Sequence, residues 1–300
     1  MKWKAHLSGI GFATIFGCSF LASKVTLEFL SPLGLLSFRF LLAFIAFEIL
    51  RLTKVIHIRF TKQVIRLVWW VVLFQPLLYF LFETYGLHFS SSSEAGMMIA
   101  LIPIVVAILS SIILKEKPTL LQWGCILLSI GGILLIETMG VGGSRSNNWM
   151  GVLLLLGAVI AAAFFNIFSR KASQELHPME ITYFMMLGGA IVFNGMNVAD
   201  HLIHNSFATY LDGLSNPIVL IALLYLGIAS SVVAFFLVNY SLSKLTAPIS
   251  SLYSNLSTVI TILMGVLFLQ ETLTVYHIIG SIMIIVGVYL STVLKRFKVL

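Results

Sequence analysis

Ten long apolar stretches follow one another along this chain and are separated by short polar segments. A helix of about 20 residues crosses the roughly 30 Å of hydrocarbon in a bilayer, so each stretch is long enough to span a membrane. Because the stretches are continuously apolar rather than alternating, they predict helices and not the strands of a barrel. They lie near residues 6–26, 31–50, 67–87, 91–114, 119–138, 149–169, 179–198, 216–239, 246–269 and 274–294.

The composition excludes a water-soluble globule. Hydrophobic residues make up 59% of the 300 residues and charged residues only 10%, whereas about a quarter of a soluble domain is charged. The net charge of +7 does not indicate nucleic-acid binding, because the Lys and Arg residues lie almost entirely in loops and tails. We therefore predict an all-α membrane protein with ten transmembrane helices.

Positive charge predicts which ends of the helices face the cytoplasm, since Lys and Arg are retained on that side. If both termini are cytoplasmic, the inner segments hold fifteen of the 18 Lys and Arg residues, and the outer segments hold only Lys24 and Arg145. The remaining one, Arg39, lies inside the second stretch. We expect a multi-pass protein of the cytoplasmic membrane, whose first stretch acts as a signal anchor because it lacks a small-residue cleavage site.

The two halves of the chain repeat the same order of residues, which indicates a duplication. At an offset of 146 residues, Trp3, Gly11, Lys24, Pro32 and Phe38 match Trp149, Gly157, Arg170, Pro178 and Phe184. At an offset of 155 residues, Tyr85, Leu87, Leu114 and Glu116 match Tyr240, Leu242, Leu269 and Glu271. We predict two five-helix repeats, at residues 1–140 and 147–297.

An odd number of helices in each copy requires the second copy to enter the membrane from the opposite side. The loops agree with this inversion. The loop between the second and third stretches carries five Lys or Arg residues, whereas its counterpart near residues 199–215 carries Asp200 and Asp212 and no Lys or Arg. The predicted fold is therefore two inverted five-helix repeats.

Short motifs in both halves resemble those of one family of membrane proteins. The first half carries Phe16-Gly17-Cys18-Ser19-Phe20 before Lys24, Pro32 with Arg39-Phe40, Gly86-Leu87-His88-Phe89-Ser90-Ser91, Leu101-Ile102-Pro103-Ile104, and Lys115-Glu116. The second half carries Gly151, Arg170-Lys171, Ala247-Pro248, Glu271, Gly280 and Gly287. The chain thus resembles the drug/metabolite transporter superfamily, in its EamA-like branch of bacterial ten-helix exporters. It departs from that pattern at Phe16, where a Trp is usual, and at Thr258, where a Pro is often found.

The resemblance implies a secondary transporter rather than an enzyme. Such a protein exports small organic metabolites, such as amino acids or amphipathic compounds, across the bacterial cytoplasmic membrane by alternating access and without a cofactor. Its partners would be a small-molecule substrate, the lipid bilayer and protons as a coupling ion, with no nucleic acid. The sequence also lacks a phosphate-binding loop, a serine-hydrolase elbow and a metal-ligand cluster. A passive facilitator or channel and a membrane-embedded lipid-modifying enzyme remain as alternatives.

Polar side chains within hydrocarbon are costly and therefore mark candidate substrate contacts. Gln75, Tyr79, Glu83 and Gly86 recur at helical spacing on one stripe of the third stretch, which either lines a cavity or forms a packing seam. Glu94 and Met97 lie one turn apart in the fourth stretch. We expect Glu83 and Glu94 to recognise an amino group or carry a coupling proton.

The second half adds polar candidates, and both halves add aromatic ones. Asn166, Asn239, Tyr253 and Asn255 are the polar insertions, for which hydrogen bonding between helices is the competing account. Three rings could form apolar walls of the site or belong to the core or the lipid-facing surface: Phe16, Phe20 and Phe235.

Other conspicuous residues are predicted to be structural. Arg39 is expected to pair with Glu94, because a charge in lipid is tolerated mainly when it is paired. Glu116 and Glu271 are expected to cap the helices that follow them. Five glycines predict the close approach of two helices, either within the chain or between two copies in a homodimer: Gly124, Gly131, Gly132, Gly280 and Gly287.

Overall fold

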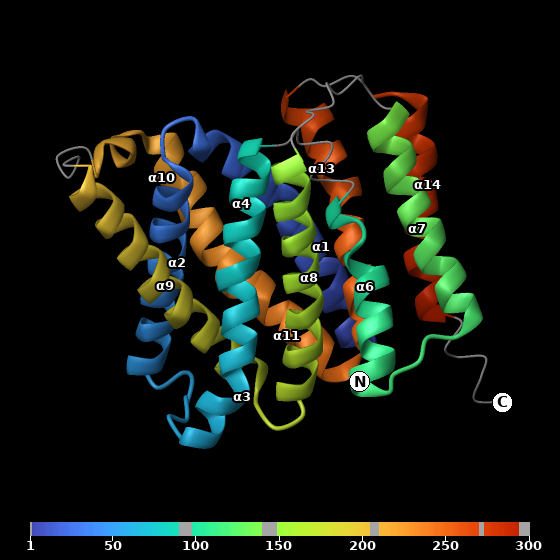
Figure 1. Cartoon of the computed structure of the whole chain (residues 1–300), viewed down its shortest axis with the longest axis horizontal. Helices are drawn as coiled ribbons and strands as arrows, with labels where there is room; N and C mark the ends of the chain where they lie inside the picture. Colours follow the sequence, from blue (N-terminus) through green and yellow to red (C-terminus); the bar gives the residue numbers. More distant parts are fainter. Residues whose placement is uncertain (1, 90–97, 140–148, 205–209, 270–272, 294–300) are drawn as a thin grey trace.

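The computed structural model describes residues 2–89, 98–139, 149–204, 210–269 and 273–293, and these form a bundle of helices (Figure 1). The first half contains α1 (Lys2–Leu27), α2 (Pro32–Leu52), α3 (Lys62–Val72), the π-helical segment η1 (Leu73–Leu78), α4 (Tyr79–Phe89), α6 (Ile102–Leu109), the π-helical η2 (Ser110–Leu114) and α7 (Leu120–Met139).

The second half repeats this order of elements. It contains α8 (Trp149–Ala172), α9 (Pro178–Ile203), the short 3₁₀ turn η4 (Asp212–Ser215), α10 (Pro217–Leu224), the π-helical η5 (Tyr225–Ala234), α11 (Phe235–Lys244), α12 (Ala247–Leu252), α13 (Ser254–Leu269) and α14 (Val275–Val293).

The predicted ten spans are confirmed. Seven helical segments are long and apolar enough to cross a membrane: Trp3–Leu27, Pro32–Leu52, Lys62–Gly86, Trp149–Ala172, Pro178–Ile203, Pro217–Lys244 and Ala247–Phe268. The other three spans are shorter apolar helices: Ile102–Leu114, Leu120–Ile136 and Val275–Ser291. Each of the ten overlaps one of the apolar stretches.

Local capping explains where several helices begin. The Ser31 hydroxyl accepts a hydrogen bond from the Gly34 amide at 3.0 Å, and Pro32 occupies the first helical position, where its missing N–H costs nothing. At the start of α9, the side chains of His177 and Glu180 each accept a bond from the backbone around the cap. Polar residues at the ends of apolar stretches thus fix the helix boundaries.

Equivalent helices of the two halves contact each other, as a two-fold relation between the repeats requires. The second helices, α2 and α9, pack together at one side of the bundle, and the fifth helices, α7 and α14, pack at the other (Figure 1). The two members of each pair run in opposite directions. The inverted repeat is therefore present in the fold.

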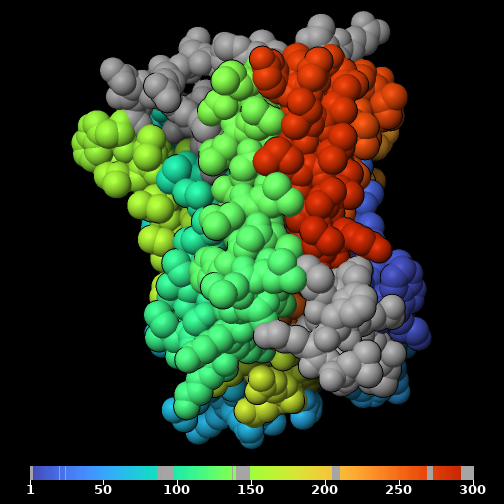
Figure 2. Space-filling view, turned by 90° about the vertical axis from the view of Figure 1, so that its right-hand side faces the viewer, coloured from blue at the N-terminus to red at the C-terminus, as the bar shows by residue number. Residues whose placement is uncertain are grey.

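The glycine seam lies within the chain, between α7 and α14, which are side by side on one face of the molecule (Figure 2). A Cβ atom on Gly280 would lie 2.5 Å from the carbonyl oxygen of Gly132, and one on Gly287 would lie 2.7 Å from that of Cys125. Gly124 has nothing within 4 Å of such an atom. Gly132, Gly280 and Gly287 therefore serve the internal one of the two predicted arrangements, whereas Gly124 has no part in this seam.

Candidate functional site

Two spans lose regular α-helical geometry midway through the bundle, at equivalent places in the two halves. In the third span, η1 contains Gln75 with an extended backbone (φ −149°, ψ 118°) next to Pro76, which has no N–H to donate. In the eighth span, η5 covers the equivalent region, with Ser230 at the position of Gln75 by the 155-residue offset. Membrane transporters commonly form their sites at such discontinuous helices.

Phe80 and Phe235 lie at the starts of α4 and α11, just beyond these irregular segments, and contact each other at the middle of the bundle. Their ring centroids are 6.4 Å apart and the rings are inclined by 69°. The offset of 155 residues makes them equivalent positions in the two halves. Equivalent residues can touch only near the two-fold axis, so this contact marks the centre of the duplicated fold.

Two of the predicted aromatic residues meet at this centre. The ring of Phe16 lies 5.4 Å from that of Phe235, and Phe165 lies 6.3 Å from Phe235 on another side. Phe235 is buried, whereas Phe16 is partly exposed. Their proposed role as walls of a site stays a prediction, but both rings lie where the two halves meet. The side chain of Phe20 lies outside the described part of the chain.

Tyr253 joins the same aromatic group from α12 and α13. Phe12 connects it to the centre, with ring centroids 6.4 Å from Tyr253 and 6.0 Å from Phe16. The hydroxyl of Tyr253 lies 2.8 Å from Nδ1 of His6, a residue that the sequence patterns did not single out. Gly9 permits this packing, since a Cβ atom there would lie 2.6 Å from the Tyr253 ring.

The polar stripe of the third span divides into two parts. The Tyr79 hydroxyl donates a hydrogen bond of 2.8 Å to the carboxylate of Glu83, and the Tyr79 ring lies 5.2 Å from that of Phe80. Gly86, one turn further, packs against Leu155 of α8, where a Cβ atom would clash at 2.9 Å. Tyr79 and Glu83 therefore adjoin the aromatic centre, while the end of the stripe forms a packing seam.

Arg39 is buried beside this centre and bonds to η5. Its Nε donates to the Ser231 hydroxyl at 2.8 Å and its Nη2 to the Ser230 hydroxyl at 2.9 Å. The guanidinium lies 4.9 Å from the centroid of the Phe80 ring, a cation–π contact. Within the described residues no carboxylate is at ion-pair distance, although Glu83 is near enough to attract Arg39 electrostatically.

Several predicted residues lie outside the described part of the chain: Glu94, Met97 and Glu271. The expected ion pair between Arg39 and Glu94 therefore stays a prediction. The described partners of Arg39 are hydroxyls and a ring, which together can satisfy a buried guanidinium. Nothing local in the sequence indicated Ser230 and Ser231 as those partners, because they are some 190 residues away.

Of the three asparagines predicted as candidates in the second half, two bond to other helices of the protein. Asn239, fully buried, accepts a bond of 2.6 Å from Ser169 in α8 and donates one of 2.9 Å to Thr182 in α9. Asn255 donates to Ser129 of α7 at 3.2 Å, and Asn166 donates to a carbonyl of its own helix at 2.9 Å. These bonds favour the packing account for Asn239 and Asn255.

Glu116 caps a helix of the other half instead of the helix that follows it. Its carboxylate accepts a bond of 2.9 Å from the backbone N–H of Ala247, the first residue of α12, and pairs with Arg170 at 2.9 Å. The start of α7 is instead stabilised by reciprocal bonds between Thr119 and Gln122. The chain turns sharply at Lys115, whose φ of 57° is left-handed, and this redirects Glu116.

A second ion pair joins the halves at the same end of the bundle. Arg59, in the loop between α2 and α3, donates to the Glu180 carboxylate of α9 at 2.8 Å and 2.9 Å, and this partner raises the pKa of Arg59. With the Glu116–Arg170 pair, it closes the end at which α1 begins (Figure 1). Charges from both halves thus hold that end together.

Two inverted five-helix repeats that meet around a shared aromatic and polar centre define a membrane transporter. The family follows from the sequence, because the profile of the EamA-like transporter family matches residues 3–138 and again residues 149–293. The chain belongs to this family. Each half matches the same profile, in agreement with the duplication, although the exact repeat boundaries stay a prediction.

Relatives of similar length are named as transporters. An uncharacterized transporter of Bacillus subtilis, YcxC, is 35% identical over 290 residues, covering 96% of this chain and 93% of that protein. An uncharacterized transporter of Archaeoglobus fulgidus is 26% identical, covering 92% and 94%. A solved crystal structure with 18% identity covers 97% of this chain and 98% of its own, with a TM-score of 0.79, and so shares the fold.

Proposed function

We propose that the protein is a secondary transporter that exports a small zwitterionic or amine-bearing metabolite, such as an amino acid, across the cytoplasmic membrane. The observation that carries this proposal is the group of Glu83, Arg39, Phe80 and Phe235 at the junction of the two repeats. It combines a carboxylate, a guanidinium and aromatic walls in one place. A zwitterion with an apolar side chain offers the complementary groups.

Glu83 has the central role in this proposal. Its carboxylate is bonded to Tyr79 and attracted to Arg39, but it is not locked into an ion pair among the described residues. A carboxylate held in this way can accept an amino group or a proton, because it retains acceptor sites. Export coupled to proton entry would use the same residue for both purposes.

Alternating access supplies the mechanism. The pairs Glu116–Arg170 and Arg59–Glu180 each join one half of the chain to the other at the end where we place the cytoplasm. Both must separate for the centre to open to that side, whereas opening to the outside leaves them intact. Each transport cycle would therefore break and remake these contacts.

Counterflow in proteoliposomes tests the proposal, since only a carrier accelerates uptake of label when unlabelled substrate waits inside. A thermal-shift screen of amino acids and amines first selects the probe, because a ligand of the folded state raises its apparent stability. We expect saturable counterflow for that probe, reduced at least tenfold in Glu83→Gln. The matched control is Glu28→Gln, in an exposed loop between α1 and α2.

Two results would contradict the proposal. Flux without counterflow would indicate a channel. Counterflow that is identical in wild type and Glu83→Gln at every pH would remove both roles assigned to this carboxylate.

A further inference from the structure

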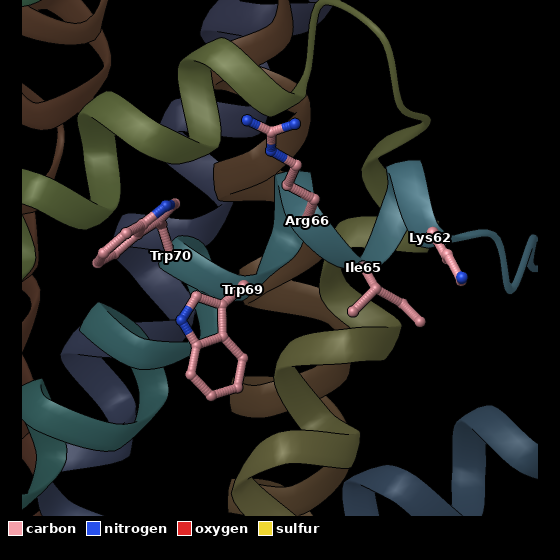
Figure 3. A pocket seen from close by; sticks show the side chains of 5 residues that line it. All are labelled: Lys62, Ile65, Arg66, Trp69 and Trp70. Atoms are coloured by element: carbon pink, nitrogen blue, oxygen red, sulfur yellow. The ribbon is translucent and has the colours of Figure 1, made fainter.

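A groove on the surface of α3 and α8 is separate from the central site. One part, of about 300 Å³, is lined by Lys62, Ile65, Arg66, Trp69 and Trp70 of α3 (Figure 3). A second part, of about 380 Å³, lies between α3 and α8 and is lined by Gln63, Arg66, Leu67, Trp70, Phe168, Lys171, Ala172 and Glu175. Arg66 and Trp70 border both parts, so the two parts are adjacent and are treated together as the groove.

Three cations in this groove have no carboxylate partner within ion-pair distance among the described residues: Lys62, Arg66 and Lys171. This distinguishes them from Arg51, Arg59 and Arg170 at the same end of the bundle, each of which is paired. The carboxylate at the rim, Glu175, accepts a bond of 3.2 Å from Gln63. The groove therefore presents positive charge that the protein does not neutralise.

The wall of the groove is aromatic and rigid. Trp70 stacks on Phe168 at 5.8 Å, and Phe168 stacks on Phe74 at 5.6 Å with the rings nearly parallel. Phe164 continues this stack 4.8 Å from Phe74. A stack of four rings holds the α3 and α8 walls in a fixed relation, so the groove does not depend on a bound partner for its shape.

Charge lies next to apolar surface in the part of the groove between α3 and α8, where Arg66 and Lys171 line it together with Leu67, Trp70 and Phe168. Lys62 and Arg66 lie toward the end of the bundle, and the exposed side chains of Ile65 and Trp69, 48% and 59% accessible, lie on the same helix within about 10 Å of Lys62 at 1.5 Å per residue. Figure 3 shows Ile65 and Trp69 projecting from one side of α3 and Arg66 from another.

We propose that this groove binds an anionic phospholipid of the cytoplasmic leaflet. Its phosphate would lie between Arg66 and Lys171, which line the same part of the groove, with an acyl chain along Leu67, Trp70 and Phe168. Basic pockets between transmembrane helices on the cytoplasmic side suit such headgroups. Lys, Arg and Trp residues are common where transmembrane helices meet the cytoplasmic interface, so their presence alone does not indicate a lipid site. A groove shared by two helices, in which cations without a carboxylate partner among the described residues lie beside stacked rings, is stronger evidence for one. The proposal relies on the membrane orientation given above, but not on the cargo.

The test compares lipid binding by purified full-length protein in detergent, read as the thermal shift on titration with phosphatidylglycerol, phosphatidylcholine or inorganic phosphate. The variant Arg66→Gln/Lys171→Gln removes two groove charges. The control Lys4→Gln/Lys244→Gln removes two exposed lysines from the same end of the bundle. Arg66→Lys/Lys171→Arg keeps the charge of the groove.

We expect wild type to prefer phosphatidylglycerol to phosphatidylcholine by roughly tenfold or more in apparent affinity. The preference should disappear in Arg66→Gln/Lys171→Gln and persist in both the control and the charge-retaining variant. Equal affinity of wild type for the two lipids would overturn the proposal, as would an unchanged preference in the Gln variant. A shift of the same size with inorganic phosphate would show an anion site that does not recognise lipid.

Discussion

Phe80 and Phe235 occupy equivalent positions in the two inverted halves, and their rings touch. This contact joins residues at the starts of α4 and α11, just beyond two irregular helical segments, one from each half. The guanidinium of Arg39 lies over the ring of Phe80, and the ring of Phe16 packs against that of Phe235. The two halves therefore share one centre and do not each form a separate one.

Replacing either aromatic ring of this pair by a leucine side chain should weaken substrate binding. Phe80→Leu and Phe235→Leu keep apolar volume but remove the aromatic surface, so we expect each to lower apparent affinity several-fold and by similar amounts. The measurement is the half-saturating concentration in the thermal-shift titration. Phe268→Leu, an exposed position on α13, should leave it unchanged. A large effect at one ring and none at the other would argue against a shared site.

Breaking the pair between Glu116 and Arg170 should open the end of the bundle that we place in the cytoplasm. Glu116→Gln removes the charge that holds Arg170 and weakens the cap on α12, so α12 loses a tie to the first half. In a Cys18→Ser/Cys125→Ser background, a cysteine introduced at the buried Ser250 should react with maleimide about tenfold faster in Glu116→Gln. Glu28→Gln is the control, and equal labelling rates in all three proteins would refute this role.

Replacing Asn239 separates the two accounts of the polar residues on the second half. Asn239→Ala removes the acceptor of the buried Ser169 hydroxyl and the donor to Thr182, whose hydroxyl keeps its bond to the Pro178 carbonyl, and this should cost about 1–3 kcal/mol of stability. If Asn239 acts only in packing, the folded fraction of the variant should bind substrate with a half-saturating concentration within twofold of the wild-type value. A larger change in the half-saturating concentration, without loss of thermal stability, would show that Asn239 contacts the substrate.

Adding one methyl group should have opposite outcomes at two glycines of α7 and α14. Gly280→Ala places a carbon 2.5 Å from the Gly132 carbonyl oxygen and from the Ile136 side chain, so the helices must separate and the melting temperature should fall by several degrees. Gly124→Ala meets nothing within 4 Å and should be neutral or slightly stabilising. Equal melting temperatures for the two variants would contradict the packing described here.

The sequence predicted the helices and their inversion because both depend on local properties. Twenty-residue apolar stretches specify spans, and an odd number of them in each repeat specifies opposite directions. Tyr253 was expected near the junction of the repeats, because a polar residue within the membrane tends to face inward. For Phe16 and Phe235 the sequence left a site wall, the core and the lipid-facing surface as alternatives.

The partners of individual side chains were not predictable in this way. His6 meets Tyr253 across 247 residues, Glu116 meets Ala247 across 131, and Arg39 meets Ser231 across 192. Such contacts depend on which helices become neighbours in the folded bundle, and no periodicity along one helix contains that information. The sequence also gave no sign that α3 would combine with α8 to form a groove.

The central claim is that one site at the junction of the repeats is exposed alternately to the two sides of the membrane. A cysteine introduced at Phe16 in the Cys18→Ser/Cys125→Ser background tests it with an impermeant thiol reagent, applied to right-side-out and to inside-out vesicles. The account predicts labelling from both sides, with protection from both by the substrate selected in the thermal-shift screen. Labelling from one side alone, whether substrate is present or not, would contradict it.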